Sequence, residues 1–151
     1  MAVRRLQRGP ERTRPAMAGA WALVYDHECG VCRVVAALVL VADRRARLMP
    51  VALQDPRIPT LLAPVPATAR LRSWHLVAPD GRVRSGGDAV PELCRLLPGF
   101  GGLGLLGGAA PDTTQRIYAG LAGNRGRLAR LIPGRVVGWA TGVLSRRGGR
   151  G

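Results

Sequence analysis

The sequence contains no lysine: all 23 basic residues of this 151-residue chain are arginines. Aromatic residues are scarce, with three Trp, two Tyr and one Phe, so a core would consist mainly of Val, Leu and Ala. No apolar run approaches the roughly 18 residues that a membrane-spanning helix requires, which excludes such a helix. The length fits one domain, and a domain of this size buries about 70% of its unfolded surface without a metal or a disulfide framework.

Acidic residues are also few, nine in all, which leaves a formal net charge of +14. The excess lies at the two ends: residues 1–20 carry five Arg and one Glu, and residues 116–151 carry eight Arg and no acid. We expect weak binding to anionic surfaces through these ends. No specific nucleic-acid partner is expected, because aromatic residues do not interleave with the basic ones. Arg125, Arg127 and Arg130 are interpreted as a solvated helix face.

The first 19 residues combine Arg, Gly and Pro without apolar periodicity, which predicts a disordered basic arm. They lack the apolar segment of a secretory signal, so we expect a cytoplasmic protein. In a reducing cytoplasm, cysteines that lie close together are more often catalytic or metal-binding than structural. The chain has three cysteines, at positions 29, 32 and 94.

Apolar spacing predicts a strand at 21–25 (WALVY), a helix from Gly30 to Ala42 and a second strand at 48–53. A strand–helix–strand unit of this kind makes its two strands parallel. Further along the chain, the pattern predicts in order a short helix at 58–63, strands at 73–78 and 83–85, a helix at 89–97 with Asp88 as its N-cap, a loop or bent apolar segment at 99–108, and a last helix at 113–131.

This order of elements is that of the thioredoxin fold. The sequence therefore predicts an α/β protein with a central mixed four-stranded sheet flanked by helices and a C-terminal helical extension. We expect one domain over residues 20–132, including the C-terminal helix. Residues 133–151 are rich in Gly and Arg and are expected to form a tail.

The sharpest chemical signal is Cys29-Gly30-Val31-Cys32, which stands between the first strand and the first helix. Cys29 would lie at or just before the first turn, where free backbone N–H groups and the helix dipole stabilise a thiolate. Cys32 would lie on the same face of the helix, close enough for a disulfide after a modest further approach. We therefore interpret Cys29 as the attacking thiolate and Cys32 as the resolving thiol.

A metal site is the rival interpretation of these cysteines, because Cys94 with His75 or His27 could complete four ligands. Against it, the sequence has no second Cys-x-x-Cys, Cys94 lies in an apolar helical pattern, and apolar residues flank His75 in a strand. No metal and no bound cofactor are therefore expected. A redox-sensing module without turnover and a basic adaptor that binds polyanions stay open as non-enzymatic alternatives.

The segment at 24–33 (VYDHECGVCR) resembles the signature of the DCC thiol-disulfide oxidoreductase family, in which an apolar strand precedes Asp-Gly, one residue and Cys-x-x-Cys. The resemblance implies a thioredoxin-like fold and protein-disulfide reductase activity, and we expect disulfides of proteins or of small molecules as substrates. His27 stands where the family usually has Gly, and a positive φ there would strain a histidine. Further matches keep their order downstream, over about residues 21–133 in all: Asp80-Gly81-Arg82, Gly86-Gly87-Asp88-Ala89, Leu96-Leu97-Pro98-Gly99, and Tyr118 with Asn124-Arg125.

The resemblance also makes Asp26 part of the motif, and thus a third candidate site residue beside Cys29 and Cys32. Positioning the loop and relaying a proton are two roles that it could have there. An Asp just before a helix more often caps the turn through its carboxylate, and the sequence leaves both interpretations open. His27 and Glu28 are interpreted as solvated loop residues.

Overall fold

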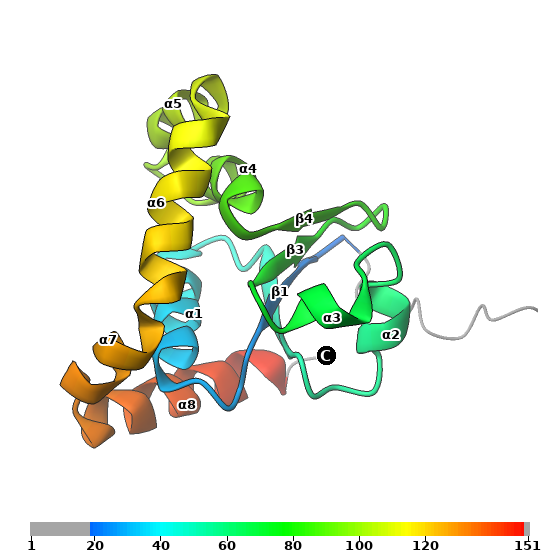
Figure 1. The fold of residues 1–151 in the computed structure, drawn as a ribbon. Helices are drawn as coiled ribbons and strands as arrows, with labels where there is room; N and C mark the ends of the chain where they lie inside the picture. Colours follow the sequence, from blue (N-terminus) through cyan, green and yellow to red (C-terminus); the bar gives the residue numbers. More distant parts are fainter. Residues whose placement is uncertain (1–18, 150–151) are drawn as a thin grey trace, which may run out of the picture.

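The computed structural model describes residues 19–149 of the chain (Figure 1). The strands are β1 (Trp21–Tyr25), β2 (Leu48–Ala52), β3 (His75–Val77) and β4 (Val83–Ser85). The helices are α1 (Gly30–Ala42), α2 (Ile58–Leu61), α3 (Ala67–Arg70), the 3-10 helix η2 (Gly86–Ala89), α4 (Val90–Leu96), α5 (Gly101–Ala109), α6 (Pro111–Gly123), α7 (Arg125–Leu131) and α8 (Gly134–Gly148).

The four strands form one sheet in the order β2-β1-β3-β4. β1 and β2 are parallel, with Trp21 opposite Leu48, as the predicted strand–helix–strand unit requires. β3 is antiparallel to both β1 and β4. Because β2 is an edge strand, Pro50 can lie in it although it has no N–H to donate. The mixed four-stranded sheet with its flanking helices confirms the predicted α/β, thioredoxin-like fold.

Alternate residues of β1 contribute to two cores, one on each face of the sheet. Leu23 and Tyr25 belong to the larger core, to which α1, α4 and α8 contribute. Ala22 and Val24 belong to a smaller core, to which α2 contributes. The helix that bears the cysteine pair therefore lies on the larger core. Its fully buried side chains are Ala36, Ala37 and Leu40.

Residues 134–148 form a helix, not the tail that their Gly and Arg content suggested. α8 packs against α1 (Figure 1). It also contacts the edge strand β2. Its apolar residues stand in three pairs, Val136-Val137, Trp139-Ala140 and Val143-Leu144, separated by Gly and polar residues. Ala140, Val143 and Leu144 fall on one face and are buried. Packing of this face, more than helix propensity, stabilises the helix.

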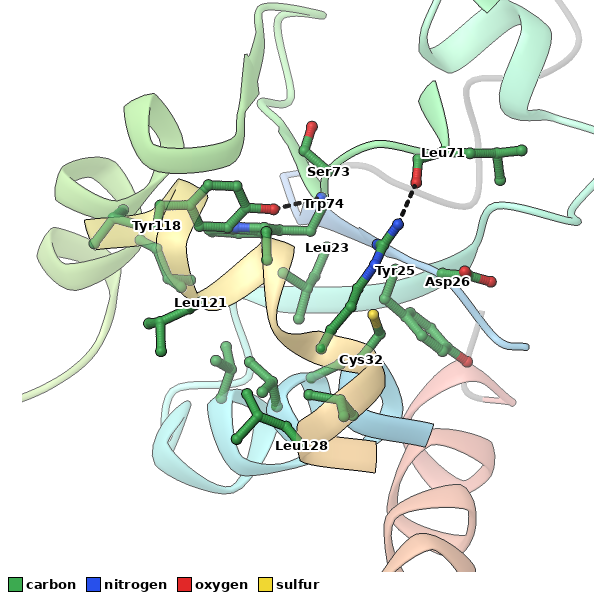
Figure 2. Close-up of a pocket in the computed structure, with 18 residues that line it drawn as sticks. Leu23, Tyr25, Asp26, Cys32, Leu71, Ser73, Trp74, Tyr118, Leu121 and Leu128 are labelled. Carbon is green, nitrogen blue, oxygen red and sulfur yellow. Dashed lines mark hydrogen bonds between the residues drawn. The ribbon is translucent and has the colours of Figure 1, made fainter. Parts of the chain in front are cut away.

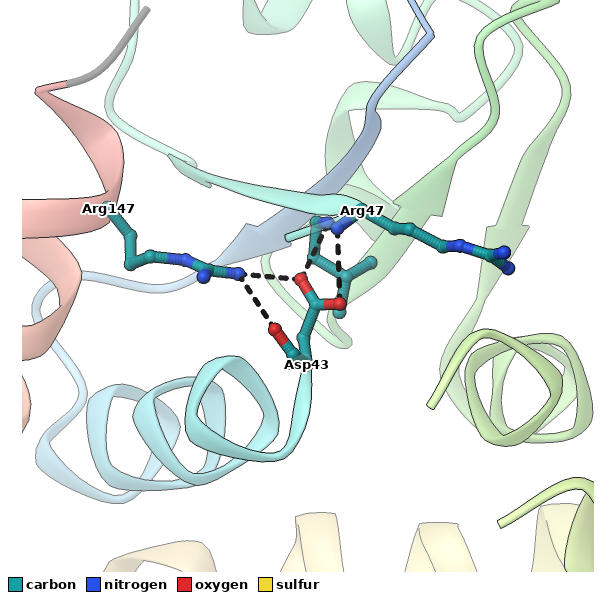
Figure 3. A network of polar contacts seen from close by, with 4 residues as sticks. Asp43, Arg47 and Arg147 are labelled. Carbon is teal, nitrogen blue, oxygen red and sulfur yellow. Dashed lines mark hydrogen bonds and ion pairs between the residues drawn. The ribbon is translucent and has the colours of Figure 1, made fainter. Parts of the chain in front are cut away.

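A buried ion pair joins α8 to the turn between α1 and β2, as Figure 3 shows. The Asp43 side chain is fully buried, and its carboxylate accepts the backbone N–H groups of Arg47 at 3.1 Å and Leu48 at 2.8 Å. From α8, Arg147 Nη2 donates to Asp43 Oδ2 at 2.6 Å and to the Asp43 carbonyl oxygen at 3.4 Å. The end of α1 is thereby fixed to the C-terminal helix.

The glycine-rich stretch at 99–108 also forms a helix, α5, where a loop or bent segment was expected. Gly104 explains how this helix packs against α4. A Cβ at this position would lie 2.7 Å from the carbonyl oxygen of Pro91, so only glycine allows the close approach of the two helices. Composition alone did not reveal this contact between helices.

Several helices differ from the predicted ones: α2 ends at Leu61 rather than 63, and α3 lies in a stretch for which no helix was predicted. The single helix predicted at 113–131 is divided into α6 and α7 at Asn124, whose side chain donates to the carbonyl oxygen of Gly120 at 2.8 Å. Asp88 lies inside the 3-10 turn η2, and the N-cap of α4 is Ala89. Of the arm predicted at 1–19, all but Gly19 lies outside the described residues. Over residues 19–149, no helix is both long and apolar enough to cross a bilayer.

Candidate active site

Cys29 lies at the N-cap of α1, in an extended conformation with φ −89° and ψ 115°. Its Sγ accepts the backbone N–H of Cys32 at 3.4 Å. The sulfur occupies the place of the capping oxygen that Ser or Asp would supply, and an N–H group of the first turn points at it. The predicted position of Cys29, at or just before the first helical turn, is confirmed.

Cys32 is half-buried in the first turn of α1, and both cysteines are free thiols. The pKa of Cys32 is raised to about 12, first by burial and then by a hydrogen bond to the Cys29 side chain and by the charge of Cys29. The charge of Arg125 lowers this pKa, and that of Asp26 raises it. Cys32 is therefore a neutral thiol at pH 7.

Asp26 and Gln54 organise the loop that leads from β1 to Cys29. Asp26 Oδ1 accepts the backbone N–H of Glu28 at 3.0 Å and the Gln54 Nε2–H at 3.0 Å. Gln54 Oε1 in turn accepts the backbone N–H of His27 at 3.3 Å. The carboxylate of Asp26 thus caps the turn before the helix. Sequence reasoning missed Gln54, because a single polar loop residue that acts across 28 positions leaves no local pattern.

The backbone at His27 does not have a positive φ, so this position does not require a glycine. Within residues 19–149, the non-glycine residue with a positive φ is Ala46, at 51°. The His27 ring lies 6.2 Å from the Tyr25 ring, centroid to centroid, with the planes tilted by 60°. His27 and Glu28 are both exposed, as predicted for solvated loop residues.

A cavity of about 340 Å³ opens beside Cys32 (Figure 2). Residues of β1, α1, α4, α6 and α7 line it, together with the segment before β3. Cys32 belongs to the lining and Cys29 does not. The two cysteines therefore have different surroundings. Cys29 lies at the start of the helix, and Cys32 lies in the wall of the cavity. Most side chains of the wall are apolar, and its polar groups belong to Tyr25, Asp26, Cys32, Ser73, Trp74, Tyr118 and Arg125.

Tyr118 on α6 and Arg125 on α7 connect the cavity wall to the segment before β3. Tyr118 Oη accepts the backbone N–H of Trp74 at 3.3 Å, and Arg125 Nη2 donates to the carbonyl oxygen of Leu71 at 3.5 Å (Figure 2). Burial raises the pKa of Tyr118. Arg125 is half-buried at the cavity, so its interpretation as part of a solvated face was wrong.

The glycines before α4 have a packing role in this wall. A Cβ on Gly87 would lie 2.7 Å from the Cα of Gln115 on α6, which no other residue type allows. This close approach holds α6, which carries Tyr118, against η2. The Gly-Gly-Asp-Ala segment therefore helps to place one helix of the cavity wall.

The rival metal ligands do not gather around the cysteine pair. His75 is fully buried, with Nε2 2.9 Å from the carbonyl oxygen of Arg70 and Nδ1 2.7 Å from Ser85 Oγ. Because a carbonyl only accepts, Nε2 carries the proton and Nδ1 accepts from the hydroxyl. Burial lowers the pKa of His75. Among residues 19–149, no three or more His, Cys, Asp or Glu side chains form a group that could hold a metal ion.

Comparison with known proteins identifies one family. The family described as DCC1-like thiol-disulfide oxidoreductase matches residues 23–131, which is more than half of the chain. The matched stretch runs from β1 to α7 and contains the loop residue Asp26 and both cysteines of the pair, whereas α8 lies beyond it. No curated protein and no solved structure matches the chain.

Proposed function

This chain belongs to the DCC1-like thiol-disulfide oxidoreductase family, and from that premise we propose that it reduces disulfide bonds of protein substrates in the cytoplasm. Cys29 is the nucleophile and Cys32 the resolving thiol. The observation that carries the proposal is the Cys29 sulfur at the N-cap of α1, which accepts the Cys32 N–H at 3.4 Å. A helix N-terminus and a directed N–H favour the thiolate, which is the form that attacks a disulfide.

In the first step, the Cys29 thiolate attacks one sulfur of the substrate disulfide. A bond forms between Cys29 Sγ and that sulfur, and the substrate S–S bond breaks. The second substrate sulfur leaves as a thiolate and takes a proton from water. The product of this step is a mixed disulfide between the protein and its substrate.

In the second step, Cys32 releases the substrate. Once Cys29 is in a mixed disulfide it carries no charge, and the contributions of its charge and of the thiolate hydrogen bond to the raised pKa of Cys32 disappear. Cys32 then loses its proton to water more readily, and its thiolate attacks Cys29 Sγ. A Cys29–Cys32 disulfide forms, the bond between Cys29 and the substrate breaks, and the substrate sulfur leaves as a thiolate that takes a proton from water. The substrate has gained two electrons and the cysteine pair has lost two. An external dithiol returns the pair to its reduced form.

We assign Asp26 a positioning role in this reaction. Its hydrogen bonds to the Glu28 N–H and to Gln54 support a fixed geometry for the loop that presents Cys29. A proton relay remains the alternative for this carboxylate, and substitutions described in the Discussion separate the two.

The test of the proposed function is trapping of the mixed disulfide. Cys32→Ser should accumulate an adduct with a model protein disulfide, because nothing remains to displace the partner, while Cys29→Ser should trap none. Cys94→Ser is the matched control, since this half-buried cysteine of α4 has no part in the mechanism. It should turn over like the unmodified protein. Adducts are read on a non-reducing gel, and turnover is followed with dithiothreitol as reductant.

Two results would contradict the proposal. Equal trapping by Cys29→Ser and Cys32→Ser would overturn the assignment of the two roles. Absence of disulfide reduction by the unmodified protein would overturn the enzymatic proposal and favour a redox-sensing module.

A further inference from the structure

The cavity beside Cys32 is built to receive an apolar group. Its volume of about 340 Å³ lies within the size range of protein sites for small ligands, about 300–1,000 Å³. Apolar side chains from β1, α1, α4, α6 and α7 make up most of the wall. Of the polar groups, the Tyr118 hydroxyl accepts the Trp74 N–H and the Arg125 guanidinium donates to the Leu71 carbonyl. Because most of the wall is apolar, the space offers mainly dispersion contacts and exclusion of water.

The mouth of this cavity is also apolar. Val35, Leu71 and Leu121 belong to the lining, yet 54%, 60% and 60% of their surfaces remain exposed. They come from three separate parts of the chain: α1, the segment before β3 and α6. A group that entered the cavity while attached to a longer chain would cover them as well, which a small molecule confined to the interior would not.

The cavity meets the cysteine pair at the resolving thiol. Cys32 lies in the wall, and its backbone N–H is 3.4 Å from Cys29 Sγ. In the mixed disulfide, the substrate sulfur is bonded to Cys29 Sγ, the atom that Cys32 must reach. Because Cys32 lies in the cavity wall, a residue that flanks the substrate sulfur is within reach of the cavity when Cys32 attacks. Figure 2 shows Cys32 among Leu23, Tyr25 and Leu128 of the wall.

We propose that this cavity is a substrate subsite that binds a large apolar side chain next to the cystine of a polypeptide substrate. The inference rests on the proposed disulfide reductase function and specifies its substrate class. A site of this kind selects disulfides with an aromatic or branched aliphatic neighbour over those with a small polar neighbour, because burial of the apolar group stabilises the complex and the transition state for exchange.

The test compares two synthetic peptide disulfides of equal length and charge that differ in one residue beside the cystine, Phe or Ser. The unmodified protein, with dithiothreitol as reductant, should reduce the Phe peptide with a kcat/KM about tenfold higher than the Ser peptide. A second pair consists of the mixed disulfides of cysteine with 2-phenylethanethiol and with 2-mercaptoethanol. It tests whether the cavity prefers an apolar group on a small-molecule disulfide to one on a peptide.

α6 supplies a matched pair of variants. Leu121 lines the cavity and Ile117, one turn earlier, does not, although the two are 60% and 62% exposed. Leu121→Asn should reduce the Phe/Ser ratio to about threefold or less, and Ile117→Asn should leave the ratio unchanged. Because both side chains are largely exposed, neither substitution is expected to prevent folding.

The outcomes separate this inference from the function on which it rests. Equal rates on the two peptides, or equal effects of the two variants on the ratio, would overturn the subsite while leaving disulfide reduction intact. A preference confined to the small-molecule pair would overturn the assignment to a polypeptide side chain. Failure to reduce any of the four disulfides would overturn the proposed function itself.

Discussion

Cys29 and Cys32 are three residues apart, but their local environments differ in ways that suit two chemical roles. Cys29 caps a helix and accepts an N–H, while Cys32 lies in the wall of an apolar cavity, and its pKa is raised to about 12, mainly by burial and further by the neighbouring Cys29. The difference comes from the helix itself: one sulfur lies before the first turn, and the other lies within it. Asp26 stands at the start of the same loop, where its Oδ1 accepts from Glu28 N and Gln54 Nε2.

The role of Asp26 can be tested by two substitutions at this position. Asp26→Asn keeps an oxygen that accepts from the Glu28 N–H, whereas Asp26→Ala removes it. If Asp26 positions the loop, Asp26→Asn should retain kcat/KM within about threefold, and Asp26→Ala should lose about tenfold, the equivalent of one capping hydrogen bond of about 1 kcal/mol and some loop order. The measurement is the pH profile of disulfide reduction between pH 6 and 9.

A proton relay gives the opposite pattern. Asp26→Asn would then be as inactive as Asp26→Ala, and both variants would change the shape of the pH profile. Gln54→Ala is the companion variant, because it removes the second partner of Asp26 Oδ1 without removing a carboxylate. If Asp26 positions the loop, Gln54→Ala should lower kcat/KM in the same way as Asp26→Ala but by a smaller factor.

At the scale of the elements, α8 contacts α1, the helix that carries Cys32, near both ends of α1. In the first turn of α1, Arg33 Nη1 donates to Thr141 Oγ1 at 3.2 Å. Past its last turn, Asp43 is paired with Arg147. The apolar face of α8 fills the space between these contacts in the larger core. An element beyond the matched family stretch therefore fixes the position of α1.

Arg147→Ala should reduce the free energy of unfolding by about 2–3 kcal/mol. The substitution leaves the buried Asp43 carboxylate without its counter-ion, although two backbone N–H groups still donate to it. Arg146→Ala is the matched control, because Arg146 is the exposed neighbour on the same helix. It should change the free energy of unfolding by less than about 0.5 kcal/mol. Both values are measured by urea denaturation at pH 7, and equal effects of the two variants would contradict a structural role of the ion pair.

At the scale of the whole molecule, His75 connects three parts of the fold. It lies on β3, its Nε2–H donates to the carbonyl oxygen of Arg70 at the end of α3, and its Nδ1 accepts from Ser85 on β4. Burial lowers its pKa in the folded state, so in the folded protein the ring stays neutral at a pH where an unfolded histidine, with a pKa of about 6.5, already binds a proton.

This difference predicts how global stability depends on pH. Below about pH 6.5 the unfolded state binds more protons than the folded state, so the free energy of unfolding falls as the pH falls. His75→Phe should lose about 1–3 kcal/mol at pH 7.5, because two hydrogen bonds are removed. The variant also lacks this titrating group. The difference in free energy of unfolding between it and the unmodified protein should therefore become smaller as the pH falls from 7.5 to 5.5.

The measurement is urea denaturation of both proteins across that pH range. His27→Phe, at an exposed position, controls for the loss of an imidazole. A stability deficit of His75→Phe that stays constant with pH would contradict the assignment of a buried, neutral His75.

The local sequence determined the first half of this fold and the position of the dithiol. The apolar run at 21–25, the helical spacing from Gly30 and the run from Leu48 predict β1, α1 and β2 because each of these signals repeats over one element. The placement of Cys29 at the start of α1 followed from the same boundary. Such signals act over a few residues, so one chain suffices to detect them.

Tertiary structure alone decided what closes the site. The burial of Ala140, Val143 and Leu144 in α8 depends on α1, whose apolar face is more than ninety residues away in the chain. The hydrogen bond between Asp26 and Gln54 also joins segments that are far apart in the chain, and so does the cavity beside Cys32. Neither can be predicted from the sequence of one segment. Periodicity and capping are properties of one segment, whereas a packed interface or a cavity exists only when several segments are placed together. For that reason the sequence could indicate the reactive pair, and only the fold could show the apolar space that one of its sulfurs faces.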